Sequence, residues 1–172
     1  CALPISGEHI SNDISGLIGQ YAHGNEPSHH IAYLFNRAGK PWRTQYWINQ
    51  ILKTQYNTTP NGLSGNEDAG QMSAWYVWSS MGLYPFNPAS ATYEIGSPVY
   101  EKSTINLPSG KTFTISAAGV SEDNFYIQSA TLNGEAFNQT SITHEQITAG
   151  GELKLVMGAT PNKNWGVAAQ AE

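Results

Sequence analysis

The chain has 172 residues, and 40% of them are hydrophobic, which is enough to build the core of one domain or of two small ones. Only 12% of the residues are charged, and the formal net charge is −5 with 8 Lys and Arg in all. These cations do not cluster, so the sequence argues against a nucleic-acid partner, because neutralising phosphates requires grouped positive charges. A surface poor in charge and rich in Asn, Thr, Ser, Gln and Tyr favours neutral polar ligands.

Cysteine content and hydropathy narrow the class of protein further. Cys1 is the only cysteine, which excludes an internal disulfide and a metal site built from thiolates. No run of about 18 apolar residues occurs, so no membrane span is expected. The chain begins without methionine and in the middle of a pattern, and we expect it to be a piece of a longer protein. The alternative is that a mature protein has been processed.

The first half of the chain, residues 1–87, is expected to be helical. Asn12 or Asp13 can cap a short amphipathic helix at its start. The apolar face of this helix follows helical spacing and consists of Ile14, Leu17, Ile18 and Tyr21. A second helix is expected to start at Pro27, because proline suits the first helical turn, and to stop at Gly39.

Two longer helices complete this half. One opens at Pro41, and its apolar positions are Trp42, Tyr46, Trp47, Ile51 and Leu52. The other extends from Met72 to Met81 and ends before Gly82 and Pro85, which cannot continue a helix.

The second half, residues 88–172, is expected to be a β region. The pattern changes there from helical spacing to alternation of Thr, Val, Ile, Tyr and Phe between turn signals. The expected strands span residues 92–95, 99–105, 112–115, 126–132 and 153–156. Hairpin turns are indicated at residues 108–111 and at Asn133-Gly134. Short strands at this spacing favour an antiparallel β-sandwich, so the expected fold class is α+β.

Residues 65–76 (GNEDAGQMSAWY) place two acids in a glycine-flanked turn before an aromatic helix. The glycines allow unusual backbone conformations, and the start of a helix favours negative charge. Glu67 and Asp68 can therefore project into a pocket, where an ionised acid could act as a general base. The alternative is that Asp68 caps the helix and Glu67 is exposed.

Residues 24–30 (GNEPSHH) form a second polar cluster at the expected start of a helix. Glu26, Asn25 and Asp68, with nearby carbonyl groups, could build a Ca²⁺ site, because calcium takes mixed carboxylate, amide and backbone oxygens. The spacing between these residues does not match a calcium-binding loop, so only the fold could bring them together.

His29 and His30 are adjacent in the sequence and would diverge on a helix, which argues against a zinc site. We expect one of them to hydrogen-bond a polar ligand and the other to pack against Tyr33.

Aromatic residues crowd the helical half, and most are expected to be buried. They are Trp42, Trp47, Trp75, Tyr76 and Trp78. Because they lie close to the polar clusters in the sequence, the alternative is that some stack on sugar rings.

Four segments of the chain resemble glycoside hydrolase family 92. They are HGNEPSHH, YLFNRAGKPWRTQ, GLSGNEDAGQMSAWYVWSSMGLYP and YEIGSPVYEK, and they occur in this order. The resemblance extends from about Asp13 to Trp165 and is to the C-terminal part of the bacterial enzymes. Members of the family are calcium-dependent, exo-acting α-mannosidases that invert the anomeric configuration. Their fold combines an (α/α)6 barrel with β-sandwich structure.

The resemblance implies roles for individual residues. Asp68 corresponds to the general base and Glu26 to an acid that helps to hold calcium. Asn66 stands where some members carry an acid, so it could only be an accessory to the base. We expect four residues to contact mannose-containing glycans: His29, His30, Glu67 and Trp75. The linkage that the parent enzyme hydrolyses is expected to be α-1,2.

The resemblance also implies that the chain is part of an enzyme. The general acid of the family belongs to a glutamate motif upstream of HGNEPSHH, and nothing before His23 matches it. Four helices cannot close a twelve-helix barrel, so we expect the remainder of the parent enzyme to be a partner and the chain alone to be inactive. Exposed apolar faces at Trp42, Trp47 and Trp75 would favour self-association. The parent protein is expected to be periplasmic, secreted or at the cell surface.

Two other classes of function remain open from the sequence. The chain could be a sugar-binding or structural module, or it could belong to another (α/α)6 glycosidase such as a glucosidase. Calcium-dependent affinity for mannose without turnover would favour the first of these alternatives.

Overall fold

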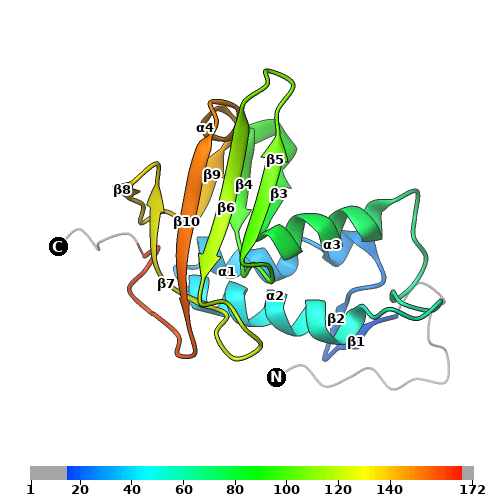
Figure 1. Ribbon diagram of the computed structural model, residues 1–172. Helices are drawn as coiled ribbons and strands as arrows, with labels where there is room; N and C mark the ends of the chain where they lie inside the picture. Colours follow the sequence, from blue (N-terminus) through cyan, green and yellow to red (C-terminus); the bar gives the residue numbers. More distant parts are fainter. Residues whose placement is uncertain (1–14, 168–172) are drawn as a thin grey trace, which may run out of the picture.

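The computed structural model of the protein describes residues 15–167, in which a layer of helices lies beside two β-sheets (Figure 1). The first strands and helices are β1 (Leu17–Ile18), β2 (Tyr21–Ala22), α1 (Leu34–Arg37), α2 (Pro41–Gln55), α3 (Gln71–Met81), β3 (Leu83–Asn87) and β4 (Thr92–Ile95). They are followed by β5 (Lys102–Asn106), β6 (Thr112–Ala118), β7 (Tyr126–Leu132), β8 (Glu135–Ala136), β9 (Ser141–Thr143), α4 (His144–Thr148) and β10 (Gly151–Gly158). Short 3-10 helices cover Glu26–Ser28, Ile31–Tyr33 and Pro88–Ser90. The α+β fold class is confirmed.

The helices α2 and α3 form where the sequence predicts them. Pro41 lies in the first turn of α2, where its missing N–H costs no hydrogen bond. The helical layer has a hydrophobic core formed by Ala32, Tyr33, Ile48, Ile51, Leu52 and Trp75. Gly70 and Gly82 bound α3 with φ values of 94° and 90°, which glycine adopts without strain.

The first predicted helix is wrong for the residues that the structure describes. Residues 17–22 form the antiparallel hairpin of β1 and β2 instead. Gly16 and Gly19 have φ values of 64° and 62°, which a right-handed helix cannot contain. Ile18 and Tyr21 still pack against the helical core, so their apolar character reflects burial of the hairpin. Three residues of the predicted helix lie outside the described part of the chain: Asn12, Asp13 and Ile14.

The second predicted helix, from Pro27 to Gly39, is interrupted. The chain makes two 3-10 helices before the short α1, with bonds such as Tyr33 N–H to the His30 carbonyl at 3.0 Å. The carbonyl of His29 accepts a hydrogen bond from the indole of α3 at 3.1 Å. That carbonyl is therefore directed toward α3, and a continuous helix does not form.

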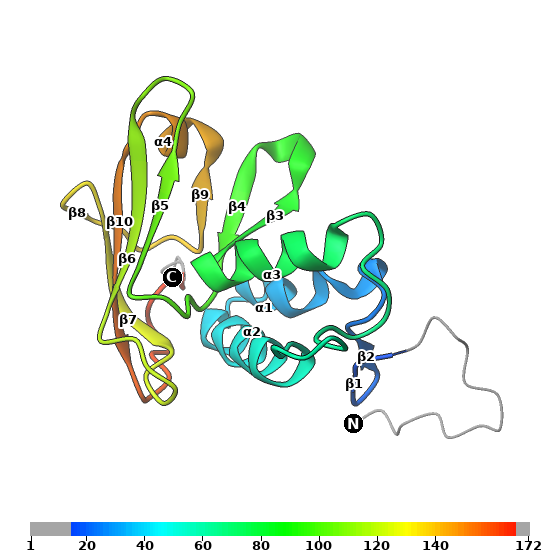
Figure 2. The same ribbon diagram turned by 45° about the vertical axis from the view of Figure 1, so that its right-hand side comes forward.

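Besides the two-stranded sheet of β1 and β2, the described residues form two larger sheets with the strand orders β3-β4-β9 and β5-β6-β10-β7-β8. Figure 2 shows them side by side, with α4 near their ends. Their buried residues form one core, to which the smaller sheet contributes Leu83, Ile95 and Ile142. Strands β10 and β6 are parallel, in contrast to the antiparallel arrangement expected for the whole region. This happens because β10 enters between β6 and β7, and it is antiparallel only to β7.

Strand boundaries differ from the prediction at two places. Residues 83–87 form β3, although the sequence indicated only the end of a helix; Pro85 is tolerated because β3 is an edge strand. The strand expected from residue 99 begins at Lys102, after an exposed segment. The proposed domain boundary after residue 87 falls at the end of β3 and stays a prediction.

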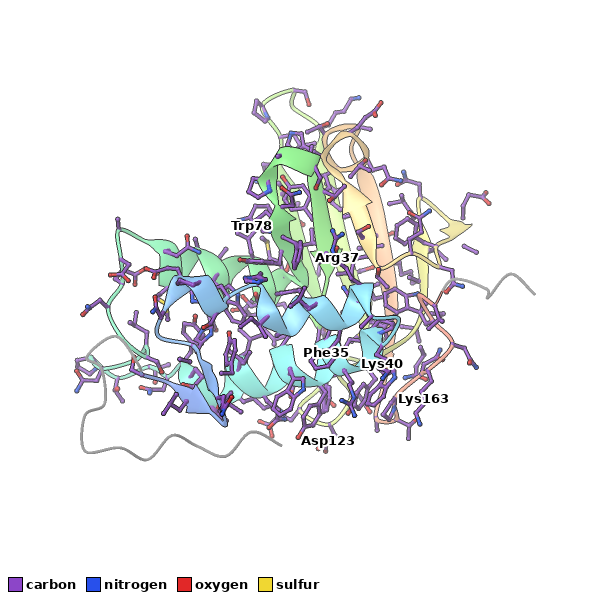
Figure 3. All side chains as sticks on the ribbon, turned by 180° about the vertical axis from the view of Figure 1, so that it is seen from behind. Phe35, Arg37, Lys40, Trp78, Asp123 and Lys163 are labelled. Atoms are coloured by element: carbon purple, nitrogen blue, oxygen red, sulfur yellow. The ribbon has the colours of Figure 1, made fainter. Side chains whose placement is uncertain are left out.

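Polar and aromatic contacts join the helical layer to the three-stranded sheet. Glu94 of β4 is buried, accepts a hydrogen bond from Asn36 at 2.9 Å and pairs with Arg37 at 3.1 Å. Trp78 of α3 stacks on Tyr93, with ring centroids 5.1 Å apart. Figure 3 shows Arg37 and Trp78 between the helices and the sheet. The helical layer therefore packs firmly on the strands.

Exposure of the tryptophans agrees only in part with the expectation for an incomplete barrel. Trp42 and Trp47 are half-buried, but Trp75 is 1% exposed, so the predicted uncovering of Trp75 is wrong. Its indole packs among His23, His29 and Tyr56.

In the stretch from residue 15 to residue 167, none of the helices has the length and apolar character that a membrane crossing requires.

Candidate active site

The two polar turns that the sequence singles out meet through their glycines. A Cβ atom added at Gly65 would lie 2.5 Å from the carbonyl oxygen of Gly24 and 3.0 Å from its Cα atom. Gly65 also has a φ of 73°, in the left-handed region that side chains disfavour. Glycine is therefore required at this contact. Because Gly24 and Gly65 touch, the two turns that follow them begin side by side.

Glu67 holds the start of α3. Its carboxylate accepts hydrogen bonds from the backbone N–H and from the hydroxyl of Ser73, both at 2.8 Å. Its carbonyl accepts a bond from Met72 N–H at 3.2 Å. These bonds pair N–H groups that the first helical turn leaves free, and the negative charge suits the helix start. The capping acid is thus Glu67, whereas the sequence alternative assigned this role to Asp68.

Asp68 projects from a left-handed turn. Asp68 and Ala69 have φ values of 50° and 55°, and Gly70 follows at 94°. Such values cost residues other than glycine about 1 kcal/mol each. The side chain of Asp68 is exposed and hydrogen-bonds the side chain of Glu26. The unusual backbone therefore aims the Asp68 carboxyl at the other turn.

Glu26 and Asp68 form a carboxyl pair. Their hydrogen bond raises the pKa of Asp68 and lowers the pKa of Glu26, and a backbone hydrogen bond of Glu26 adds to the lowering. Two hydrogen-bonded carboxyls can share a proton, or both can be ionised when positive charge lies beside them. The structure thereby brings together two acids that are far apart in the sequence.

The predicted metal ligands are only partly clustered. Asn25 precedes Glu26 on the same loop and is half-buried, and Asn66 is exposed on the neighbouring turn. Across residues 15–167, no group of three or more His, Cys, Asp or Glu residues could hold a metal ion. Calcium takes about six to eight oxygen ligands, so the pair of Glu26 and Asp68 could supply only part of a calcium site.

His29 and Trp75 form part of the packed interior of the helical layer. His29 Nε2–H donates to the His23 carbonyl at 3.0 Å, and the Trp75 indole donates to the His29 carbonyl at 3.1 Å. Each side chain is 1% exposed, and burial lowers the pKa of His29. Substrate contacts by these two residues, like that of Glu67, stay predictions. In the described residues their polar atoms are bonded within the protein.

His30 lies at the surface, unlike His29. Its ring meets the edge of Phe86 with centroids 5.8 Å apart, whereas Tyr33 stacks on Tyr84. His30 and Phe86 line a pocket of about 410 Å³, whose other walls include Gln71. Because it is exposed beside this pocket, His30 could contact a ligand.

His23 is a residue of the site that the sequence analysis did not single out. It is fully buried, with Nδ1 2.8 Å from the Tyr21 hydroxyl and Nε2 2.6 Å from the Tyr56 hydroxyl. Burial, with a smaller contribution from His29, lowers the pKa of His23 to about 3, so the ring is neutral. Its position at the head of HGNEPSHH was a signal, but its tyrosine partners could be found only from the fold.

A model of the glycosyl hydrolase family 92 catalytic domain matches residues 5–159. That match covers most of the chain, and the chain therefore belongs to this family. The resemblance noted in the sequence is confirmed.

Known relatives are similar over the same region. An uncharacterized secreted glycosidase of Arthroderma benhamiae is 36% identical over 146 residues, which cover 83% of this chain and 19% of the relative. A family 92 α-mannosidase of Bacteroides thetaiotaomicron, solved in complex with mannoimidazole, is 43% identical with a TM-score of 0.88. The similarity covers 91% of this chain and 20% of that enzyme.

A second solved structure gives the same result. The family 92 inverting mannosidase of Bacteroides thetaiotaomicron is 47% identical with a TM-score of 0.83, over 87% of this chain and 20% of that enzyme. The chain thus spans about a fifth of the length of the relatives it matches.

Proposed function

We propose that the chain is the C-terminal part of a calcium-dependent, inverting exo-α-mannosidase that hydrolyses mannose-containing glycans, with α-1,2 linkages as the preferred substrates. The observation that carries this proposal is the hydrogen-bonded pair of Glu26 and Asp68 at the contact between two glycine turns. Membership of family 92 and the similarity to two Bacteroides mannosidases support it.

Asp68 is the proposed general base. A base must be ionised and within reach of the water that it activates. Asp68 is exposed, and its left-handed backbone directs the carboxyl away from α3 toward Glu26. Glu67, the adjacent acid, is unsuited to this role because both of its oxygens are bonded to Ser73. Asn66, with a neutral side chain, could only help to orient water.

Calcium is the proposed cofactor, with Glu26 and Asp68 as carboxylate ligands and Asn25 as a further oxygen donor. The donor set fits a hard cation, because carboxylate and amide oxygens are the ligands that calcium prefers. When bound, calcium would supply the positive charge that allows both carboxyls to ionise. The remaining ligands would be backbone oxygens, water or residues of the rest of the parent enzyme.

The rest of the parent enzyme has two proposed roles. Inversion requires a general acid on the leaving-group side as well as a base on the water side, at carboxyl separations of roughly 6.5–9.5 Å. That acid is proposed to lie in the upstream part of the parent enzyme. The helices outside this chain would complete an (α/α)6 barrel over the apolar pocket lined by Ile18, Phe35 and Trp47. The parent enzyme is proposed to be secreted, periplasmic or at the cell surface, and the name of the secreted Arthroderma relative supports secretion.

The decisive experiment uses the full-length parent enzyme. We expect it to hydrolyse α-1,2-mannobiose and an activated α-mannoside, with β-mannose as the first product in proton NMR and with loss of turnover in a chelator. Binding of mannose without turnover would instead identify a sugar-binding module. Preferred hydrolysis of α-glucosides would identify another glycosidase.

The isolated chain provides a second test. Because the proposed acid lies outside it, the purified 172-residue chain should not hydrolyse either mannoside in calcium. Its mass in solution would also test the expected self-association. Hydrolysis that disappears in Asp68→Asn would show that the chain is a whole enzyme.

A further inference from the structure

We propose that His23 is a positioning residue, which sets the separation of Glu26 and Asp68 through a buried chain of hydrogen bonds. The geometry is independent of the reaction, but the expected effect on turnover rests on the proposed function.

One tautomer of His23 satisfies all three contacts of this chain of bonds. The hydroxyl of Tyr56 has a single proton, which it can donate to the carbonyl of Met72 at 3.3 Å. With the His23 proton on Nε2, Nε2–H donates to the Tyr56 oxygen at 2.6 Å and leaves the tyrosine proton for Met72. Nδ1 then accepts from the Tyr21 hydroxyl at 2.8 Å. A neutral imidazole has one donor and one acceptor, and both are used here.

This chain of bonds joins the two turns of the site on their buried side. Along the sequence, His23 lies three residues before Glu26, and Met72 lies four residues after Asp68. The chain starts at β2, passes through the end of α2 and reaches the first turn of α3. The distance from His23 to Met72 therefore limits how far Glu26 can move from Asp68.

A second contact fixes the other end of the Glu26 loop. His29 Nε2–H donates to the carbonyl of His23, and the Trp75 indole donates to the carbonyl of His29. The ring of His23 also meets Trp75 edge-on, with centroids 4.4 Å apart. Both ends of the loop of residues 23–29 are thus tied to α3, and Glu26 lies between the two ties.

The test removes single hydroxyl groups from the full-length parent enzyme, so that the shape of the core is kept. Tyr21→Phe and Tyr56→Phe each delete one partner of His23. The matched control is Tyr93→Phe, which deletes a tyrosine hydroxyl 3.0 Å from His144 in the sheet region. Because the first two variants loosen the supporting contacts of the site, we expect kcat to fall about 10-fold with KM nearly unchanged.

Hydrogen exchange gives a readout that does not depend on activity. In Tyr21→Phe and Tyr56→Phe, the amides of residues 24–29 should exchange at least about 10-fold faster, while those of the α2 core keep their rates. The control should change neither kcat nor exchange. His23→Phe, which keeps a ring but loses both bonds, should have the largest local effect.

Either of two results would overturn the inference. One is unchanged exchange at residues 24–29 in both variants, and the other is an equal loss of kcat in Tyr93→Phe. If the wild-type parent hydrolyses no mannoside, the proposed function fails, and hydrogen exchange alone then decides whether His23 positions the loop.

Discussion

The tripeptide Gly-Asn-Glu occurs twice in this chain, at residues 24–26 and 65–67, and the two copies have different roles. Their glycines lie in contact, so both copies start from the same place in the structure. The side chain of Glu67 then binds Ser73 and caps α3, whereas Glu26 reaches across to Asp68. The same three residues thus give one structural acid and one acid of the candidate site.

The residues that follow each copy explain the difference. Pro27 directs the first copy into a 3-10 helix with its N–H groups bonded locally. In the second copy, left-handed residues from Asp68 to Gly70 fold the chain back, so that the N-terminus of α3 faces Glu67. The Glu67 carboxylate is used in capping because it faces the N–H groups at the start of α3, whereas the Glu26 carboxylate faces Asp68. Sequence context, more than residue type, assigns the roles.

The largest expected effect separates the two adjacent acids of the second turn. In the parent enzyme, Asp68→Asn should lower kcat about 10²-fold or more, because the general base is lost while the backbone turn is kept. The matched control is Glu67→Gln, which removes the same charge one residue away and should cost less than about 3-fold, because Ser73 N–H retains an acceptor. Steady-state kinetics on α-1,2-mannobiose, with circular dichroism to confirm folding, measure both. Equal losses in the two variants would remove the distinction between Asp68 and Glu67.

Activity should depend nearly as strongly on the contact between Gly24 and Gly65. In Gly65→Ala, the new Cβ would lie 2.5 Å from the Gly24 carbonyl, so the turns must separate. We expect kcat/KM to fall about 10-fold, because a displacement of about 1 Å disturbs the alignment of catalytic groups.

Gly19→Ala is the matched control for this contact. Its φ of 62° is close to the 73° of Gly65, but a Cβ atom there would meet nothing within 4 Å. Both variants should lose about 1 kcal/mol of stability from the left-handed backbone. Only Gly65→Ala should lose activity. Full activity in Gly65→Ala would mean that the close approach of the turns is dispensable.

Periodic segments were predictable from the sequence, and segments shaped by left-handed backbone were not. The helix opened by Pro41 and the strand Thr92–Ile95 follow from local spacing and agree with the structure. The hairpin of residues 17–22 has apolar residues at helical spacing, but φ values of Gly16 and Gly19 decide its fold. Such φ values depend on contacts with distant residues, which a spacing pattern does not contain.

One short helix was missed although its signal was present. Thr143 and Gln146 form a capping box at the start of α4, and this pattern is visible in the sequence. The helix has only about one and a half turns, which is too short for its apolar residues to show a helical pattern. The parallel pairing of β10 with β6 could not be predicted, because it depends on where the last strand enters the sheet.

The candidate site was predictable as two motifs but not as one geometry. Asp68 and Glu26 were identified from residue type and family resemblance, and the structure pairs them. That α3 is capped by Glu67, and not by Asp68, could be known only from the backbone conformation of the turn. His23 was missed because Tyr56, its partner, lies 33 residues away.

The pairing of Glu26 with Asp68 predicts that the pKa of Asp68 shifts when Glu26 is replaced. Their hydrogen bond raises the pKa of Asp68, so a base at this position is lost as pH falls through that raised pKa. Glu26→Gln removes the negative charge, which should lower the pKa of Asp68. Because bound calcium would itself favour ionisation of both carboxyls, the measurement is an NMR titration of the Asp68 carboxyl carbon in calcium-free protein, with and without Glu26→Gln. A pKa of Asp68 that stays in place, or rises, in the variant would contradict the pairing.

The smallest expected effect concerns the copy at residues 65–67, whose glutamate caps α3. Ser73→Ala removes the hydroxyl that donates to Glu67 at 2.8 Å but keeps the backbone N–H bond to the same carboxylate. One capping bond is worth about 0.5–1.5 kcal/mol, so the free energy of unfolding should fall by about 1 kcal/mol or less. Because the Glu26–Asp68 pair is untouched, kcat and KM should stay within about 2-fold of wild type. Urea denaturation and kinetics of the parent enzyme test this, with Thr148→Val as a control that removes a helical hydroxyl bonded to His144 and Glu145 in α4. A larger loss of kcat in Ser73→Ala than in Thr148→Val would show that the capping acid also serves the reaction.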